Sequence, residues 1–238
     1  MELELKKECL DTYELGEPQT LTQEETAETI VPDYCPDIAR IISAEGVVCL
    51  HGGTEQDGVT GTVRVTVLYT PENESGVRAL EFAMPFSAQG EGLAGCAHVV
   101  VETEIELLES RMLNPRKIFT RCKLVTHLAG CRKVCLTISS DAETDPALLV
   151  EKRCCGQTVS LLRQVAEKDL TFSETMSLSL GREGAAELLH CRANGIVTET
   201  KAIGNKLIFK GVFLVSALYR TTGGQLASAS AELPFSQI

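Results

Sequence analysis

The amino-acid sequence predicts a mainly β protein made of two repeated antiparallel β-sandwich-like units, with a few short helices. Two observations lead to this prediction. Several segments alternate apolar and polar residues with a period of two, which is typical of half-buried strands. In addition, three segments recur in the same order about 150 residues further along the 238-residue chain.

The alternation is clearest in three segments, at 63–69, 99–107 and 117–124. Every second position is apolar or small, and the positions between are largely charged or polar. Such a pattern favours antiparallel strands with one face on a core and the other in solvent. Strands therefore account for most of the structure that we expect.

Helical signals are few. Residues 36–43 suit one or two helical turns, because Pro36 and Asp37 are residue types favoured in the first turn of a helix. Residues 182–191 suit either a second short helix or the lead into a strand.

The segments 99–108 and 117–126 flank the turn-forming residues 110–116. Pairing the two segments around that turn places Glu102 opposite Lys123 and Glu104 opposite Arg121. Opposite charges across an antiparallel pair contribute about 0.2–1 kcal/mol each. We interpret this charged surface as a solvated strand face without a binding role.

The internal repeat is the most informative feature. Its matched segments are Ala44–Val48 with Ala193–Val197, Gly61–Tyr69 with Gly211–Tyr219, and Pro85–Ser87 with Pro234–Ser236. Each copy also contains a hairpin dipeptide, Asp57-Gly58 in the first and Gly204-Asn205 in the second. The repeat therefore indicates two copies of one β-rich unit.

We place these units at residues 1–145 and 146–238, joined through the polar segment 139–146. The second unit stops where its counterpart of the 99–126 hairpin would begin, so we expect it to be truncated at its C-terminal end. Its sheet is then expected to present an unpaired edge after Ser236, available to a longer parent chain, a second copy or a partner. The alternative is that both repeats share one continuous core.

Composition excludes several functional classes. The chain has 22 Lys and Arg against 33 Asp and Glu, a formal net charge of −11, which argues against nucleic acid and anionic membranes as partners. Hydrophobic residues make up 44%, enough to bury a core, but there is no Trp to stack on sugars. The N-terminus does not resemble a signal peptide, and no apolar run is long enough to span a membrane.

Without an export signal, we expect the ten cysteines to be reduced and free of metal. Cys131 and Cys135 are four apart, a separation of ~13 Å along a strand, which is too far to share one ion. Cys154 and Cys155 are adjacent, so on a strand they point to opposite faces.

The four histidines are scattered at His51, His98, His127 and His190, and no nucleophile or phosphate-binding motif accompanies them. Three glycines, at 90, 92 and 95, lack the strand–helix context of a nucleotide-binding loop. We therefore assign no catalytic, metal-binding or cofactor-binding residue, leave the partner-binding residues unknown, and expect no cofactor and no enzymatic activity.

Three motifs carry a resemblance to a known family. They are Ile30–Ile38 (IVPDYCPDI) followed by Ile41–Gly46, then Leu80–Ser87 (LEFAMPFS), then Glu106–Lys117 (ELLESRMLNPRK). Together they resemble the SPOCS domain of SipL-type sporulation proteins of clostridia. The resemblance covers the first unit almost throughout and the second more weakly, because the second lacks a counterpart of residues 31–37.

The resemblance implies a role in endospore formation, in the mother-cell cytoplasm at the forespore surface, with a SpoIVA-like coat-base ATPase as partner. Proteins of this family usually add a LysM domain that carries much of that contact. No LysM-like segment is recognised in these residues, which weakens the expected partnership. No functional residue is transferred by the resemblance.

The leading hypothesis is thus a non-enzymatic scaffold or adaptor in spore coat assembly, acting through protein–protein contacts and with an exposed sheet edge through which it could also form a homo-oligomer. The alternative is an envelope-associated β-sandwich that binds glycans. A hydrolase with a site assembled from distant residues is the third hypothesis.

Overall fold

The computed structural model describes residues 4–51, 58–143, 151, 153, 156, 158–166, 173 and 183–238, and these form ten strands and no helix. The predicted fold class, mainly β and antiparallel, is confirmed. The strands form one four-stranded and two three-stranded sheets. No helix in the described part of the chain is long and apolar enough to cross a membrane.

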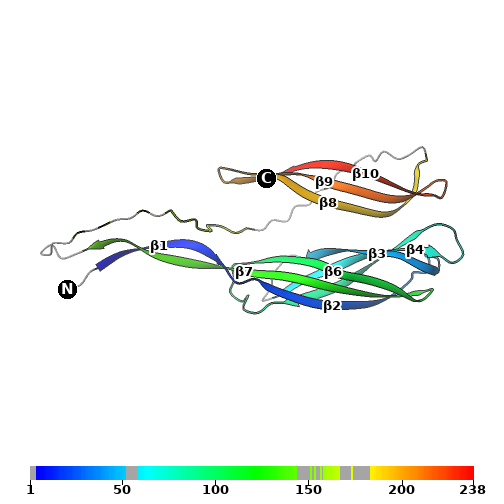
Figure 1. Ribbon diagram of the computed structural model, residues 1–238, viewed down its shortest axis with the longest axis horizontal. Helices are drawn as coiled ribbons and strands as arrows, with labels where there is room; N and C mark the ends of the chain where they lie inside the picture. The colour runs from blue at the N-terminus through cyan, green and yellow to red at the C-terminus, as the bar shows by residue number, and fades with distance from the viewer. Residues whose placement is uncertain are drawn as a thin grey trace.

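The four-stranded sheet is organised around β7 (Lys117–Glu143), a strand of 27 residues. On one side, β2 (Gln19–Ile30) pairs with its first half and β1 (Glu4–Leu15) with its second half. On the other side, β6 (His98–Asn114) pairs with the first half as far as Cys131. The second half of β7 and β1 therefore extend beyond the other strands as a two-stranded ribbon (Figure 1).

The first three-stranded sheet has the order β3 (Ile38–His51), β4 (Gly58–Pro71), β5 (Arg78–Gln89). It packs face to face with the first half of the β7 sheet and forms a β-sandwich. The apolar face of β4, including Val63 and Val65, is fully buried against Ile118 and Leu124 of β7. Alternating residues of the two sheets thus build one core, as the period of two predicts.

The second three-stranded sheet has the order β8 (Ala185–Ile203), β9 (Lys206–Thr221), β10 (Leu226–Gln237). Its strand order corresponds to β3–β4–β5, and the matched segments 61–69 and 211–219 lie in β4 and β9. Gly204 has φ +62° and forms the β8–β9 turn with Asn205, as the dipeptide predicts. Asp57 of the other dipeptide lies outside the described residues. β10 is an edge strand among the described residues.

A glycine paired with a phenylalanine recurs in these sheets. Gly61 lies opposite Phe86 and Gly211 lies opposite Phe235, so the repeated Gly and Pro-Phe-Ser segments are cross-strand partners. A Cβ atom at Gly61 would lie 2.4 Å from the Phe86 ring, and one at Gly211 2.6 Å from the Phe235 ring. Each ring therefore lies over the space that the glycine leaves open, an arrangement known to stabilise glycine in strands.

The predicted helix at 36–43 is wrong for the described residues, and of the two alternatives for 182–191 the strand is the one observed. Residues 38–43 belong to β3 and 185–191 to β8, whereas residue 182 lies outside the described part. Pro36 and Asp37, the basis of the first prediction, lie in the loop before β3, and two bulges lie near the start of each strand. They occur between Ile38 and Arg40 and between Ile41 and Ser43, and β8 has bulges at 185–187 and 188–190. Each bulge adds one residue, so apolar residues three apart share a face, which imitates helical spacing.

The predicted register of the β6–β7 hairpin is also wrong. Glu102 lies opposite His127 and Glu104 opposite Val125, because the strands are joined by a tight turn at Pro115–Arg116 rather than by a loop over 110–116. Opposite charges nevertheless meet across these strands. The observed ion pairs are Lys123–Glu106 at 2.9 Å and Arg121–Glu109 at 3.0 Å.

Two further expectations need correction. Residues 139–143 of the predicted linker belong to β7, and its remainder lies outside the described residues, so the boundary between units stays a prediction. The thiols are not all reduced, because Cys9 and Cys135 form a disulfide between β1 and β7. Their Cα atoms are 5.7 Å apart.

We predict that Gly61→Ala lowers the free energy of unfolding by about 1–3 kcal/mol, because the added methyl overlaps the Phe86 ring and forces a shift in a packed sheet. Gly156→Ala is the matched control, since a Cβ there meets nothing within 4 Å. Urea unfolding of both variants measures the difference. Equal free energies of unfolding for the two variants would show that the packing of the Phe86 ring does not require glycine at position 61.

Candidate interaction surfaces

The four histidines lie in separate places, each with a different neighbour. His51 contacts the Thr62 hydroxyl at 2.7 Å and His127 that of Thr20 at 3.0 Å. The ring of His98 lies 6.3 Å from the Tyr13 ring, measured between centroids. His190 is 3.2 Å from the Glu45 carboxylate. The described structure therefore does not bring the histidines together.

The cysteines of the described structure do not form a metal-binding cluster either. Among the described residues no group of three or more His, Cys, Asp or Glu side chains could hold a metal ion. Cys131 is buried, Cys135 is in the disulfide, and Cys154 and Cys155 lie outside the described residues. Burial raises the pKa of Cys122 to about 11, so this thiol stays protonated at neutral pH, unlike a nucleophile.

The glycines at 90, 92 and 95 lie at and after the end of β5, where no helix follows. Gly92 and Gly95 have φ values of +66° and +76°. They are turn residues that allow the chain to cross from one sheet of the sandwich to the other.

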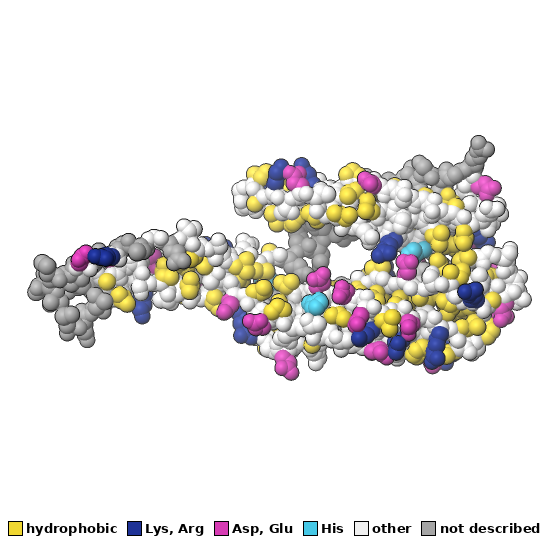
Figure 2. All heavy atoms as spheres, in the orientation of Figure 1, with side chains coloured by type: hydrophobic (Ala, Val, Ile, Leu, Met, Phe, Trp, Pro, Cys, Tyr) yellow, Lys and Arg dark blue, Asp and Glu magenta, His cyan; other side chains and the backbone are white. Residues whose placement is uncertain are grey.

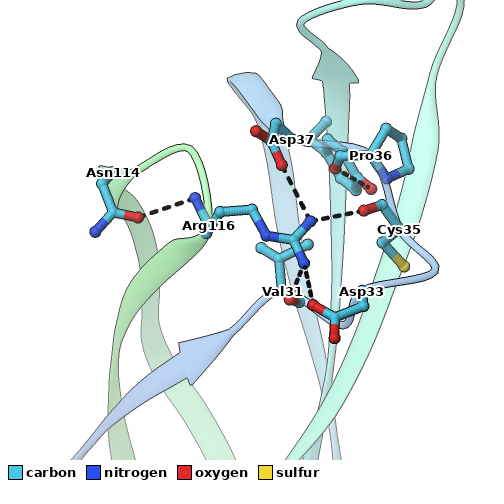
Figure 3. Close-up of polar contacts among 8 residues, drawn as sticks. Val31, Asp33, Cys35, Pro36, Asp37, Asn114 and Arg116 are labelled. Atoms are coloured by element: carbon cyan, nitrogen blue, oxygen red, sulfur yellow. Dashed lines mark hydrogen bonds and ion pairs between the residues drawn. The ribbon is translucent and has the colours of Figure 1, made fainter.

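Arg116 holds the loop 31–37 at one end of the sandwich (Figure 3). Its guanidinium donates to the Val31 carbonyl at 2.9 Å and the Cys35 carbonyl at 2.8 Å. It also contacts the carboxylates of Asp33 and Asp37, both at 3.0 Å. One planar cation with several donors in fixed directions therefore satisfies four acceptors of a single loop.

Backbone contacts complete this arrangement. The Val31 amide donates to the Arg116 carbonyl and the Ile38 amide donates to the Pro115 carbonyl, both at 2.9 Å. The Tyr69 hydroxyl donates to the Pro36 carbonyl at 3.3 Å. The two sequence motifs at 30–38 and 106–117 are thus halves of one structural connection between the sheets, and Tyr34, which is 88% exposed, is presented at the loop tip.

The outer face of the β7 sheet carries intermingled charges (Figure 2). Besides the two pairs across the hairpin, Lys117 pairs with Glu28 and Arg121 lies 3.9 Å from Glu24. These side chains are largely exposed, where a single ion pair contributes about 0.2–1 kcal/mol. The geometry fits a solvated face.

β8 approaches the sandwich where His190 meets Glu45 of β3. A pocket of about 670 Å³ lies beside this contact and is lined by residues of β3, β6 and β8. The His190 Nε2 atom is buried without a hydrogen bond of good geometry. The pocket lining mixes apolar side chains, such as Val47 and Ile105, with polar and charged ones, such as Glu104 and Arg192.

Beyond this contact, β8 exposes apolar side chains on both of its faces. Ile196 is 46% exposed and the adjacent Val197 is 55% exposed, and neighbouring residues of a strand point to opposite faces. Ile203, at the end of β8, is also exposed. Within the described structure β8 pairs only with β9, so residues 195–203 form a free edge that carries the apolar Ile196, Val197 and Ile203 beside the charged Glu199 and Lys201.

Composition and alternation could not identify the role of Arg116, because half of its acceptors are backbone carbonyls. We predict that Arg116→Lys lowers the free energy of unfolding by about 1.5–3 kcal/mol, since one ammonium cannot reach all four acceptors. Amide hydrogen exchange at Val31 and Ile38 is expected to accelerate. Arg111→Lys, which changes only the cation over the Phe119 ring, is the control; an equal loss in both variants would contradict a special role.

The buried tyrosine gives a pH prediction. Burial raises the pKa of Tyr69 to about 12 from 10.0, so the folded state favours the protonated hydroxyl. Its contribution to stability is fully present below pH 10 and is lost as the pH rises through 12. The difference in unfolding free energy between the native chain and Tyr69→Phe is therefore expected to shrink between pH 10 and 12. A difference that stays constant in urea titrations would refute this.

Comparison with known proteins locates the family signal in the C-terminal part of the chain. The family model described as SipL, SPOCS domain, matches residues 185–238. Comparisons with curated proteins and with solved structures found no match. The single match covers β8, β9 and β10, so the resemblance noted for the N-terminal unit stays a prediction. Residues 185–238, which form the whole of the β8–β9–β10 sheet, are thus similar to the SPOCS domain of SipL.

Proposed function

We propose that this protein is a non-enzymatic adaptor in sporulation and that the free edge of β8, residues 195–203, is its protein-binding surface. The SPOCS match supports a sporulation-related role. The observation that carries the binding surface is the exposure of Ile196 and Val197 on opposite faces of one edge strand. The unpaired N–H and C=O groups of an edge strand template further pairing. The charged residues of this edge, Glu199 and Lys201, pair with each other.

The edge fits a partner that contributes an extended segment. Backbone hydrogen bonds to β8 supply affinity, and apolar side chains on the two faces of the added strand cover Ile196 on one side and Val197 on the other. Following the family resemblance, the partner is a SpoIVA-like coat-base ATPase and the complex forms in the mother-cell cytoplasm at the forespore surface, as part of spore coat assembly.

The test compares two lysine substitutions at similarly exposed apolar positions of the SPOCS sheet. Val197→Lys on β8 is expected to weaken binding of a purified SpoIVA-like ATPase at least about tenfold, the effect of losing ~1.4 kcal/mol at a binding hot spot. Leu226→Lys, at the far edge strand β10, is expected to leave binding unchanged. Titration of the ATPase into each full-length variant measures both.

Pull-downs from sporulating cells extend the test to other partners. Capture that Val197→Lys abolishes and Leu226→Lys preserves supports the adaptor surface. If the native chain binds neither the ATPase nor any protein from sporulating cells, or if both variants bind equally, the proposed surface is wrong.

A further inference from the structure

The ribbon formed by β1 and the second half of β7 has two edges, and these differ in their backbone hydrogen bonds. On the β1 edge, the Tyr13 amide donates to the Leu162 carbonyl at 2.8 Å, and the Thr12 hydroxyl contacts the same oxygen at 3.1 Å. On the β7 edge, pairing with β6 ends at Cys131. Between residues 133 and 143, the described part of the chain makes no backbone hydrogen bond to this edge.

This β7 edge has the composition of a strand that pairs further. Residues 134–140 (VCLTISS) contain β-branched and apolar residues, no charge and no proline. Leu136 and Ile138 share one face and are 42% and 37% exposed. A two-stranded ribbon is marginally stable in water, and additional strands with an apolar face stabilise it.

The sequence of the edge is complementary to itself. Read antiparallel around Thr137, Leu136 of one copy lies opposite Ile138 of the other, which joins apolar to apolar on one face. Lys133, which also pairs with Asp11 of its own chain at 3.4 Å, then approaches the acidic end of the other copy's edge, at Asp141, beyond the bulge that follows Ser139. No other centre within residues 134–140 pairs Leu136 with Ile138.

We infer that a second copy of this chain occupies the edge, forming a two-fold symmetric dimer in which Thr137 meets its own counterpart on the axis. Pairing of this kind joins two ribbons into four strands and two four-stranded sheets into one continuous sheet. The surface is separate from the β8 edge, so this inference does not rest on the proposed adaptor function.

A residue on a two-fold axis permits a sharp test, because any charge placed there faces itself. Thr137→Lys and Thr137→Glu are each expected to weaken dimerisation about tenfold or more, since like charges then lie directly opposite. An equimolar mixture of the two variants is expected to dimerise at least as well as the native chain. Sedimentation equilibrium of the full chain over a dilution series measures each case.

Thr22→Lys, at another exposed threonine, on β2, is the matched control and is expected to leave the dimer intact. Thermal unfolding of each variant checks that the fold is retained. A native chain that is monomeric throughout the dilution series, a Thr137→Lys variant that dimerises like the native chain, or a mixture that remains monomeric would each overturn the inference.

Discussion

The N-terminal lobe depends on one strand. β7 supplies the hydrogen-bonding partner for β1, β2 and β6, and these three strands pair with no other strand in the described structure. Its inward side chains, such as Ile118 and Leu124, are also half of the sandwich core. A strand in this position must satisfy two neighbours and one core face at the same time, and every other element of the lobe is placed relative to it.

The two three-stranded sheets share one local packing feature, the glycine–phenylalanine pair, although other parts of the repeat differ between them. In both, a glycine in the middle strand leaves room for the phenylalanine of a Pro-Phe-Ser segment. The third repeated segment behaves differently, because Gly46 lies opposite Val65 whereas Gly195 lies opposite Phe213. The first two bulges of β8 lie 147 residues after those of β3, whereas the matched sequence segments Ala44–Val48 and Ala193–Val197 lie 149 residues apart. The structural alignment of β3 with β8 therefore differs from the sequence alignment by two residues. The glycine–phenylalanine pairs are therefore the more faithful marker of the repeat.

How far the sequence predicted this fold depends on which interactions set each element. Alternation correctly indicated β4, β6 and β7, because each buries one face. It missed β1 and β2, whose inward positions include Thr12, Gln23 and Glu25 and lack an apolar period. The start of β3 was predicted to be helical because Pro36 and Asp37 suit a first helical turn, whereas both residues belong to the loop before the strand. The register of the β6–β7 hairpin depends on the length of its turn, and amino-acid composition does not reveal that length.

The candidate surfaces were less predictable than the fold. The acidic loop and the Arg116 motif were recognised as family features, but their contact is made largely through carbonyl oxygens, which every residue possesses. The free edges of β8 and β7 depend on which strands have neighbours, and that is a property of the assembled sheets rather than of any local segment.

The placement of β7 also sets the timing of folding during synthesis. Cys9 and Cys135 are neighbours in space but 126 residues apart in sequence. At the usual ~5–20 residues per second, β1 leaves the ribosome roughly 6–25 s before the strand that receives it. β1 must remain without its partner strand for that interval, and such distant pairings form slowly even in a complete chain. The N-terminal lobe therefore cannot complete its four-stranded sheet until residue 143 has emerged.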